Sequence, residues 1–101
     1  MPAVSRQGDS LTTGHICVAT TTLTTPGQST VFANGIKVAR ITDSTVSHLF
    51  PPNVPPCGNH TSTVKVGSSS VFVEGLACAR IGDSADAGAM TTGSSNVFAG
   101  G

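Results

Sequence analysis

The sequence has no tryptophan and no tyrosine, and four phenylalanines are its only large aromatic side chains. Charged residues make up 10% of the 101 residues and balance to a net charge of zero. Five basic residues argue against nucleic-acid binding, which needs a patch or stripe of Lys and Arg. The mean hydropathy of +0.17 is too high for a disordered chain. The composition therefore favours one small, folded, β-rich domain with a thin core that needs stabilisation besides hydrophobic burial.

Long apolar runs are missing as well. No stretch of 18 apolar residues occurs, which excludes a transmembrane helix. Residues 1–10 carry no apolar run of the kind found in signal peptides, so we expect synthesis in the cytoplasm. Three cysteines, an odd number in a chain without an export signal, argue against a disulfide framework.

An internal repeat organises the chain. The stretch STVFANGIKVARITDS returns forty residues later as SSVFVEGLACARIGDS, and each half of this unit appears once more at opposite ends of the chain. We therefore predict three quasi-equivalent units in one domain, residues 1–101, with Gly101 lying near Met1. The predicted units are residues 29–44, residues 69–84, and a split unit made of residues 94–101 and 2–10.

Each unit has the pattern of a β-hairpin. A short Val-Phe run precedes a turn such as Asn34-Gly35, which is a strong two-residue turn signal. The return strand ends in an Arg-x-x-Asp element, in which we expect the Asp to cap a turn and the Arg to pair with a neighbouring unit. Cys78 aligns with Val4 and Val38 and is expected to be a small buried residue.

The histidines fall in the long connections between these units. His15 follows Asp9 by six residues and His48 follows Asp43 by five, so the two occupy nearly the same place after their respective repeats. Quasi-threefold symmetry would bring both side chains toward the axis, where the connections converge.

A cysteine accompanies the third histidine. Cys57 lies three residues before His60, and a Cys-x-x-His pair can place both side chains on one metal ion. We predict a metal site made of His15, His48, Cys57 and His60. Such nitrogen and sulfur donors suit zinc, with iron or nickel as alternatives. Cys17, two residues after His15, is a rival sulfur ligand.

Signs of catalysis are lacking. No Asp or Glu adjoins the candidate ligands to act as a general base, and we assign Glu74 and Asp86 to other parts of the fold. A Ser-His-Asp order, a Gly-rich phosphate loop and an HExxH motif are absent from the sequence. A closed four-ligand site is typical of structural metals. We therefore expect no enzyme activity and no catalytic residues.

These motifs resemble those of PAAR-repeat proteins over essentially the whole chain. The literal Pro-Ala-Ala-Arg is replaced by KVAR, ACAR and AVSR. The resemblance implies an all-β, small conical, pseudo-threefold hairpin domain with one structural zinc near the apex. His15, His48 and His60 would take the family's histidine places and Cys57 its cysteine place.

The resemblance also implies a function. Such a protein caps and sharpens a trimeric β-helical spike, either VgrG-type in type VI secretion or a phage tail spike, so that the spike can penetrate a membrane. The protein would assemble at the tip of a contractile injection apparatus and pass through the target envelope. Because the chain ends within its last repeat, we expect no fused toxin. The alternatives are a small zinc hydrolase, for which Cys57 would be dispensable, and a free-standing adaptor that carries cargo to the spike.

Overall fold

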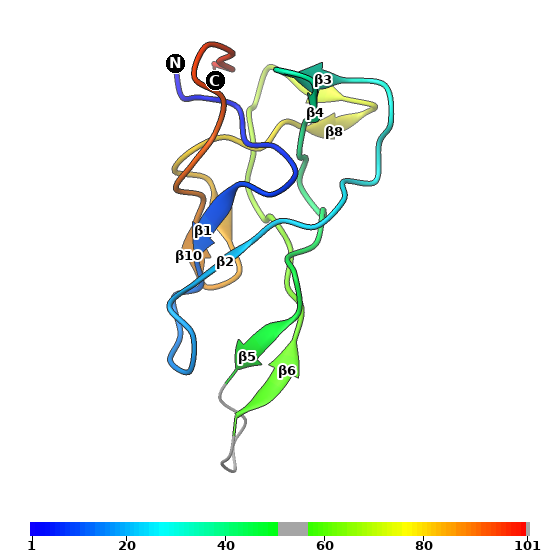
Figure 1. Ribbon diagram of the computed structural model, residues 1–101. Coiled ribbons are helices and arrows are strands. Elements are labelled where there is room, and N and C mark those ends of the chain that lie inside the picture. Colours follow the sequence, from blue (N-terminus) through cyan, green and yellow to red (C-terminus); the bar gives the residue numbers. More distant parts are fainter. Residues whose placement is uncertain (51–56, 101) are drawn as a thin grey trace.

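The computed structural model describes residues 1–50 and 57–100, apart from the side chain of Phe50. Over these residues the fold is all-β, which confirms the predicted fold class, and ten short strands pair in five antiparallel hairpins (Figure 1). None of the described segments forms a helix long and apolar enough to cross a membrane. The hairpins are β1 (Ser10–Thr12) with β2 (Thr20–Thr22), β3 (Phe32–Ala33) with β4 (Ile36–Lys37), β5 (His48–Phe50) with β6 (Gly58–His60), β7 (Phe72–Val73) with β8 (Leu76–Ala77), and β9 (Ser84–Ala85) with β10 (Gly88–Ala89).

The turns of β3–β4 and β7–β8 are those that the sequence predicts. Asn34 and Gly35 have φ of 56° and 77°, and Glu74 and Gly75 have φ of 47° and 85°. Positive φ at both central residues gives a turn whose twist matches that of the flanking strands. Gly101, expected near Met1, lies outside the described residues.

The central segments of the three repeated stretches form a closed ring of hydrogen bonds. Ser5 N–H donates to Ala79 O, Ala79 N–H donates to Ala39 O, and Ala39 N–H donates to Ser5 O, each at 2.9 Å. Each segment therefore donates to one neighbour and accepts from the other, as three segments around a common axis would. All three residues are completely buried, so only small side chains fit at the axis.

The Arg-x-x-Asp elements tie each turn together. The Asp carboxylates accept the backbone N–H of the arginine three residues earlier, as predicted, at 2.7 Å for Asp9, 2.8 Å for Asp43 and 2.9 Å for Asp83. The arginine differs from expectation, because Arg80 pairs first with its own Asp83 through Nε at 2.9 Å. A three-residue spacing around a tight turn places the guanidinium on that carboxylate. Cross-unit bonds go instead to uncharged oxygens, such as that from Arg80 Nη1 to Gly100 O.

The molecule is elongated, with extents of 41 × 23 × 22 Å. The first residues and the last described residues lie at the same end of the molecule as β3, β4 and β8, and the β5–β6 hairpin projects from the other end (Figure 1). We call these the base and the apex. Two buried clusters form the core: Val4, Ala33, Val38, Val73, Cys78 and Ala99, and Leu11, Leu23, Ala39, Val64, Ala79, Ala85 and Met90.

The base carries an exposed aromatic side chain in each repeat. Phe32, Phe72 and Phe98 are 52%, 59% and 49% exposed, and the valines that precede them are also exposed. Alternation explains why each Phe points outward, because the next residues (Ala33, Val73 and Ala99) point inward and are buried. Val31 and Val71 precede β3 and β7 and do not follow this alternation. These three phenylalanines therefore lie on the surface of the base rather than in the core.

Candidate metal centre

Four metal-binding side chains converge where the connections meet. His15, His48, His60 and Asp86 each offer one ligand atom, and these atoms all lie within 4.8 Å of one another. The structure thus brings together the three histidines that the sequence nominates. It adds Asp86, which sequence reasoning had assigned elsewhere.

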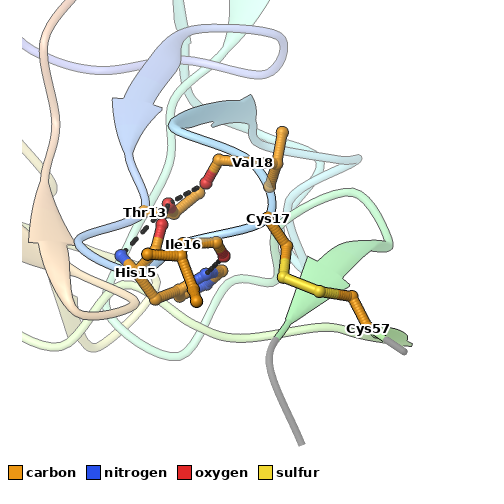
Figure 2. The surroundings of a disulfide bond; sticks show 6 residues. All are labelled: Thr13, His15, Ile16, Cys17, Val18 and Cys57. Carbon is orange, nitrogen blue, oxygen red and sulfur yellow. Dashed lines mark hydrogen bonds between the residues drawn. A yellow bond between two sulfur atoms is a disulfide. The ribbon is translucent and has the colours of Figure 1, made fainter. Parts of the chain in front are cut away.

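The loop between β1 and β2 presents His15. Buried Thr13 organises this loop, since its hydroxyl bonds to the carbonyl oxygens of His15 and Val18 at 3.2 and 2.5 Å (Figure 2). Gly14 has φ of 74°, and a Cβ there would lie 2.1 Å from Ala87 O. Glycine therefore lets the loop that carries His15 pack directly against the turn that carries Asp86.

The β5–β6 hairpin presents the other two histidines. His48 and His60 are directly paired in the antiparallel register, so their side chains lie on the same face of the hairpin. Their rings meet edge to face with centroids 4.4 Å apart, and their Nε2 atoms are 2.8 Å apart. His48 is buried, whereas His60 is half-buried.

Asp86 occupies the turn between β9 and β10 with φ of 55°, which is uncommon for a residue other than glycine. Its N–H donates to Thr63 O, and the N–H of Ala87 donates to Thr13 O. The turn is therefore fixed to both connections that supply histidines. Asp86 Oδ2 lies 2.9 Å from His15 Nε2, 2.7 Å from His48 Nε2 and 3.4 Å from His60 Nε2.

The repeat contains a signal that could have revealed Asp86. His15 and His48 each follow the Asp of an Arg-x-x-Asp element, and Asp86 follows the third such residue, Asp83, by three positions. Asp86 is the only Asp, Glu, His or Cys that follows Asp83 in the sequence. Each of the three quasi-equivalent connections thus supplies one ligand-type side chain at the axis, and His60 is the additional one.

Hydrogen bonding prepares two of the rings as ligands. His15 Nδ1–H donates to Ile16 O at 3.0 Å and His48 Nδ1–H donates to Val46 O at 2.8 Å. A carbonyl oxygen only accepts, so these bonds assign the proton to Nδ1 and leave the Nε2 lone pair for a metal ion. His48 Nε2 faces Asp86 Oδ2, His60 Nε2 and, at 3.3 Å, His15 Nε2. One proton on that nitrogen could satisfy only one of these three atoms.

A central cation would satisfy all of them. Ligand atoms about 2 Å from a tetrahedral ion stand roughly 3.3 Å apart. Five of the six separations among the four atoms are 2.7–3.4 Å, and all four atoms lie within 4.8 Å of one another. In the metal-free chain burial raises the pKa of Asp86. Hydrogen bonds from Nε2–H of His15 and His48, which need a second proton on each ring, together with the charge of His15 and His60 when protonated, outweigh burial and hold this pKa below its ordinary value. The carboxylate therefore stays ionised. Three imidazoles and one carboxylate can hold a divalent transition metal.

The two cysteines near the centre are joined to each other. Cys17 and Cys57 form a disulfide across 40 residues, with Cα atoms 6.5 Å apart (Figure 2). The sequence argued against a disulfide framework but did not predict this single bridge, because an odd count excludes a completely paired set and not one pair. In the disulfide Cys57 is not a thiolate, and its role as a ligand stays a prediction for the reduced chain. Cys78 is free and buried, as expected, and burial raises the pKa of its thiol to about 11.

The fold and the centre together define a class: a small all-β hairpin-repeat domain with a side-chain cluster at its apical half that could hold a metal ion. The family model described as PAAR motif matches residues 7–92, and the chain belongs to this family. A comparison with curated proteins finds none that matches. A role at the tip of a spike fits a PAAR-motif protein.

Proposed function

We propose that this chain is a non-enzymatic tip that caps and sharpens a trimeric β-helical spike, either VgrG-like or a phage tail spike. The observation that carries this proposal is the base, where each repeat exposes one Val-Phe pair: Val31-Phe32, Val71-Phe72 and Val97-Phe98. Three similar apolar patches on one chain can meet three identical subunits without a symmetry mismatch. We take the repeat units as residues 29–44, 69–84 and 94–101 with 2–10, within one domain.

The end of a trimeric β-helix explains why such a cap is needed. Its last strands present unpaired backbone groups and apolar side chains, which favour aggregation unless they are covered. The base offers the exposed apolar side chains of its three Val-Phe pairs. On assembly the spike would gain a closed, narrow end, and the apex would meet the target membrane first. The protein would therefore act at the tip of a contractile injection apparatus and be delivered through the target envelope.

A metal ion completes the proposed function by stiffening the apical half. We propose one divalent ion per chain, with zinc preferred, held by His15, His48 and His60. The fourth ligand is Asp86 in the disulfide form, and Cys57 is the ligand that the sequence favours. The ion would cross-link the β1–β2 loop, the β5–β6 hairpin and the β9–β10 turn. A small core gives little rigidity by itself, and a structural metal supplies folding free energy directly.

Binding to the spike is tested by size-exclusion chromatography and calorimetry with a trimeric VgrG-like or phage spike protein. We expect one chain per trimer. Phe72→Ser should weaken binding roughly 5- to 30-fold, because burying half of a Phe side chain contributes about 1–2 kcal/mol. The matched control is Ile16→Ser, because Ile16 is a 74% exposed apolar residue that follows His15 in the β1–β2 loop (Figure 2) and is not part of the base. Equal loss in both variants, or three chains per trimer, would contradict the proposed docking face.

A zinc hydrolase is the competing function, and the same cluster separates the two. A hydrolase needs an open coordination position, whereas the four convergent atoms favour a closed site. Hydrolysis of activated esters by the metal-loaded chain that exceeds free metal and disappears in His48→Ala would favour the hydrolase. The cargo-adaptor alternative predicts binding to an effector through surfaces outside the base.

A further inference from the structure

Both cysteines of the disulfide lie close in sequence to proposed metal ligands. Cys17 lies two residues after His15, and Cys57 lies three residues before His60. The disulfide therefore joins the loop that carries one ligand to the hairpin that carries another (Figure 2). Its redox state decides whether these two sulfurs are thiols that could bind a metal ion.

The backbone at Cys17 is held in an unfavourable conformation. Its φ is 82°, in the left-handed region that side chains other than glycine rarely adopt. The same residue is tied to Cys57 by the disulfide. Reduction would release this link between Cys17 and Cys57, and Cys57 directly precedes β6, which carries His60.

Reduction would also change the donors on offer. In the disulfide form, Asp86 Oδ2 completes the set with the three histidines. In the dithiol form Cys57 becomes a possible thiolate in a Cys-x-x-His pair with His60. Zinc in structural sites is bound by thiolate and imidazole far more commonly than by carboxylate, so a thiolate within reach would displace the Asp86 carboxylate.

We propose that the redox state of Cys17 and Cys57 selects the fourth metal ligand: Asp86 when the disulfide is formed and Cys57 when it is reduced. This inference rests on the metal site of the proposed function. Reduction by a dithiol adds two electrons and two protons, yielding two protein thiols and the oxidised dithiol. On metal binding the Cys57 thiol releases its proton to solvent, its sulfur takes the coordination position, and the Asp86 carboxylate leaves. Cys17 remains a thiol.

The two forms correspond to two compartments. A reducing cytoplasm would keep the thiolate form during synthesis and assembly, and an oxidising space would favour the disulfide with the carboxylate form. The metal would remain bound in both, because three histidine ligands are common to them. The device therefore preserves the rigid apex across a change of redox environment.

The test uses the full chain loaded with Co²⁺, whose spectrum reports sulfur ligation through a sulfur-to-metal charge-transfer band. The oxidised chain is compared with the chain reduced by a water-soluble phosphine and then desalted without oxygen. X-ray absorption of the zinc-loaded forms counts sulfur neighbours independently. Cys17→Ser leaves Cys57 permanently reduced, Cys57→Ser removes the sulfur ligand, and Cys78→Ala is the matched control for an uninvolved thiol.

We expect no sulfur neighbour in the oxidised chain and one in the reduced chain, in Cys17→Ser and in reduced Cys78→Ala. Reduced Cys57→Ser should lack it. Asp86→Asn should weaken metal binding more than tenfold in the oxidised form and less than threefold in the reduced form. Metal bound without sulfur in both states, or with sulfur in both, would overturn the ligand exchange while leaving the metal site intact. Failure of both states to bind metal would overturn the proposed site as well.

Discussion

The Arg-x-x-Asp turns allow a quantitative test, because their three quasi-equivalent copies are not bonded equally. Asp83 accepts three bonds from Arg80: from the backbone N–H at 2.9 Å, from Nε at 2.9 Å and from Nη2 at 3.0 Å. Asp43 accepts the backbone N–H bonds of Arg40 and Gly27 at 2.8 and 3.0 Å. Arg40 Nε lies 3.6 Å from Asp43 and has no hydrogen-bond partner among the described residues.

The two Asp→Ala substitutions should therefore differ in cost. Asp83→Ala leaves a buried guanidinium without its carboxylate, which costs about 3–5 kcal/mol. Asp43→Ala leaves two backbone N–H groups unsatisfied, which costs about 1–3 kcal/mol. It also removes the carboxylate beside Arg40, but that ion pair is longer, 3.6 Å at Nε, and includes no side-chain hydrogen bond. The expected difference is about 2 kcal/mol, or roughly 8–16 °C in Tm for a chain of this size.

Thermal and urea unfolding of both variants, with metal bound throughout, measure this difference. Metal saturation is needed because both turns lead into ligand-bearing connections. Asp83→Ala must be the less stable variant. Equal destabilisation, or a greater effect at Asp43, would refute the claim that the side-chain ion pair rather than the backbone cap dominates the stability of the turn.

Three further predictions concern the apex and the free thiol. Metal at a concentration of 100 Kd contributes about 2.7 kcal/mol to the stability of the wild-type chain, so adding a chelator to that sample should lower its Tm by roughly 11–22 °C. His48→Ala should show no such shift. A wild-type Tm that does not respond to the chelator would contradict the site. Folding lowers the pKa of Asp86. The ionised carboxylate therefore stabilises the metal-free chain above its unfolded pKa of about 3.9, and this stabilisation is lost as the pH falls through the lower folded pKa. Denaturant unfolding from pH 6 to 2 should show this loss in the wild type and not in Asp86→Asn. Burial raises the pKa of Cys78 to about 11. After treatment with an alkylating reagent at pH 8, mass spectrometry should therefore find Cys78 unmodified in the native reduced chain and modified only after unfolding. Rapid labelling of the native chain would contradict the burial of this thiol in the base.

The hairpins could be predicted from the sequence because their signals are local. Asn34-Gly35 and Glu74-Gly75 supply residues that tolerate positive φ beside β-prone runs, and repetition makes each instance support the other. The burial of Cys78 followed from its alignment with Val4 and Val38. Each of these inferences needed only the unit and its copy.

The candidate site was predictable only in part because it depends on contacts between units. His15 and His48 were found through their equivalent positions after Asp9 and Asp43. Asp86 has no histidine or cysteine near it in the sequence, so its neighbours do not mark it as a ligand; quasi-symmetry places its connection at the axis.

The disulfide was missed for a similar reason. Counting cysteines gives no information on which loops meet, and the approach of Cys17 to Cys57 follows from the packing of the β1–β2 loop against the β5–β6 hairpin. Spacing within the sequence suggested a Cys57–His60 chelate instead.

The central claim is that His15, His48 and His60 hold one metal ion with a fourth ligand at the apical half. Elemental analysis combined with X-ray absorption of the purified chain tests it most directly. The account predicts one metal ion per chain with three imidazole nitrogens and one further neighbour, and less than one tenth of that metal content in His48→Ala. A chain that binds no metal after incubation with zinc, or that keeps its metal in His48→Ala, would contradict it.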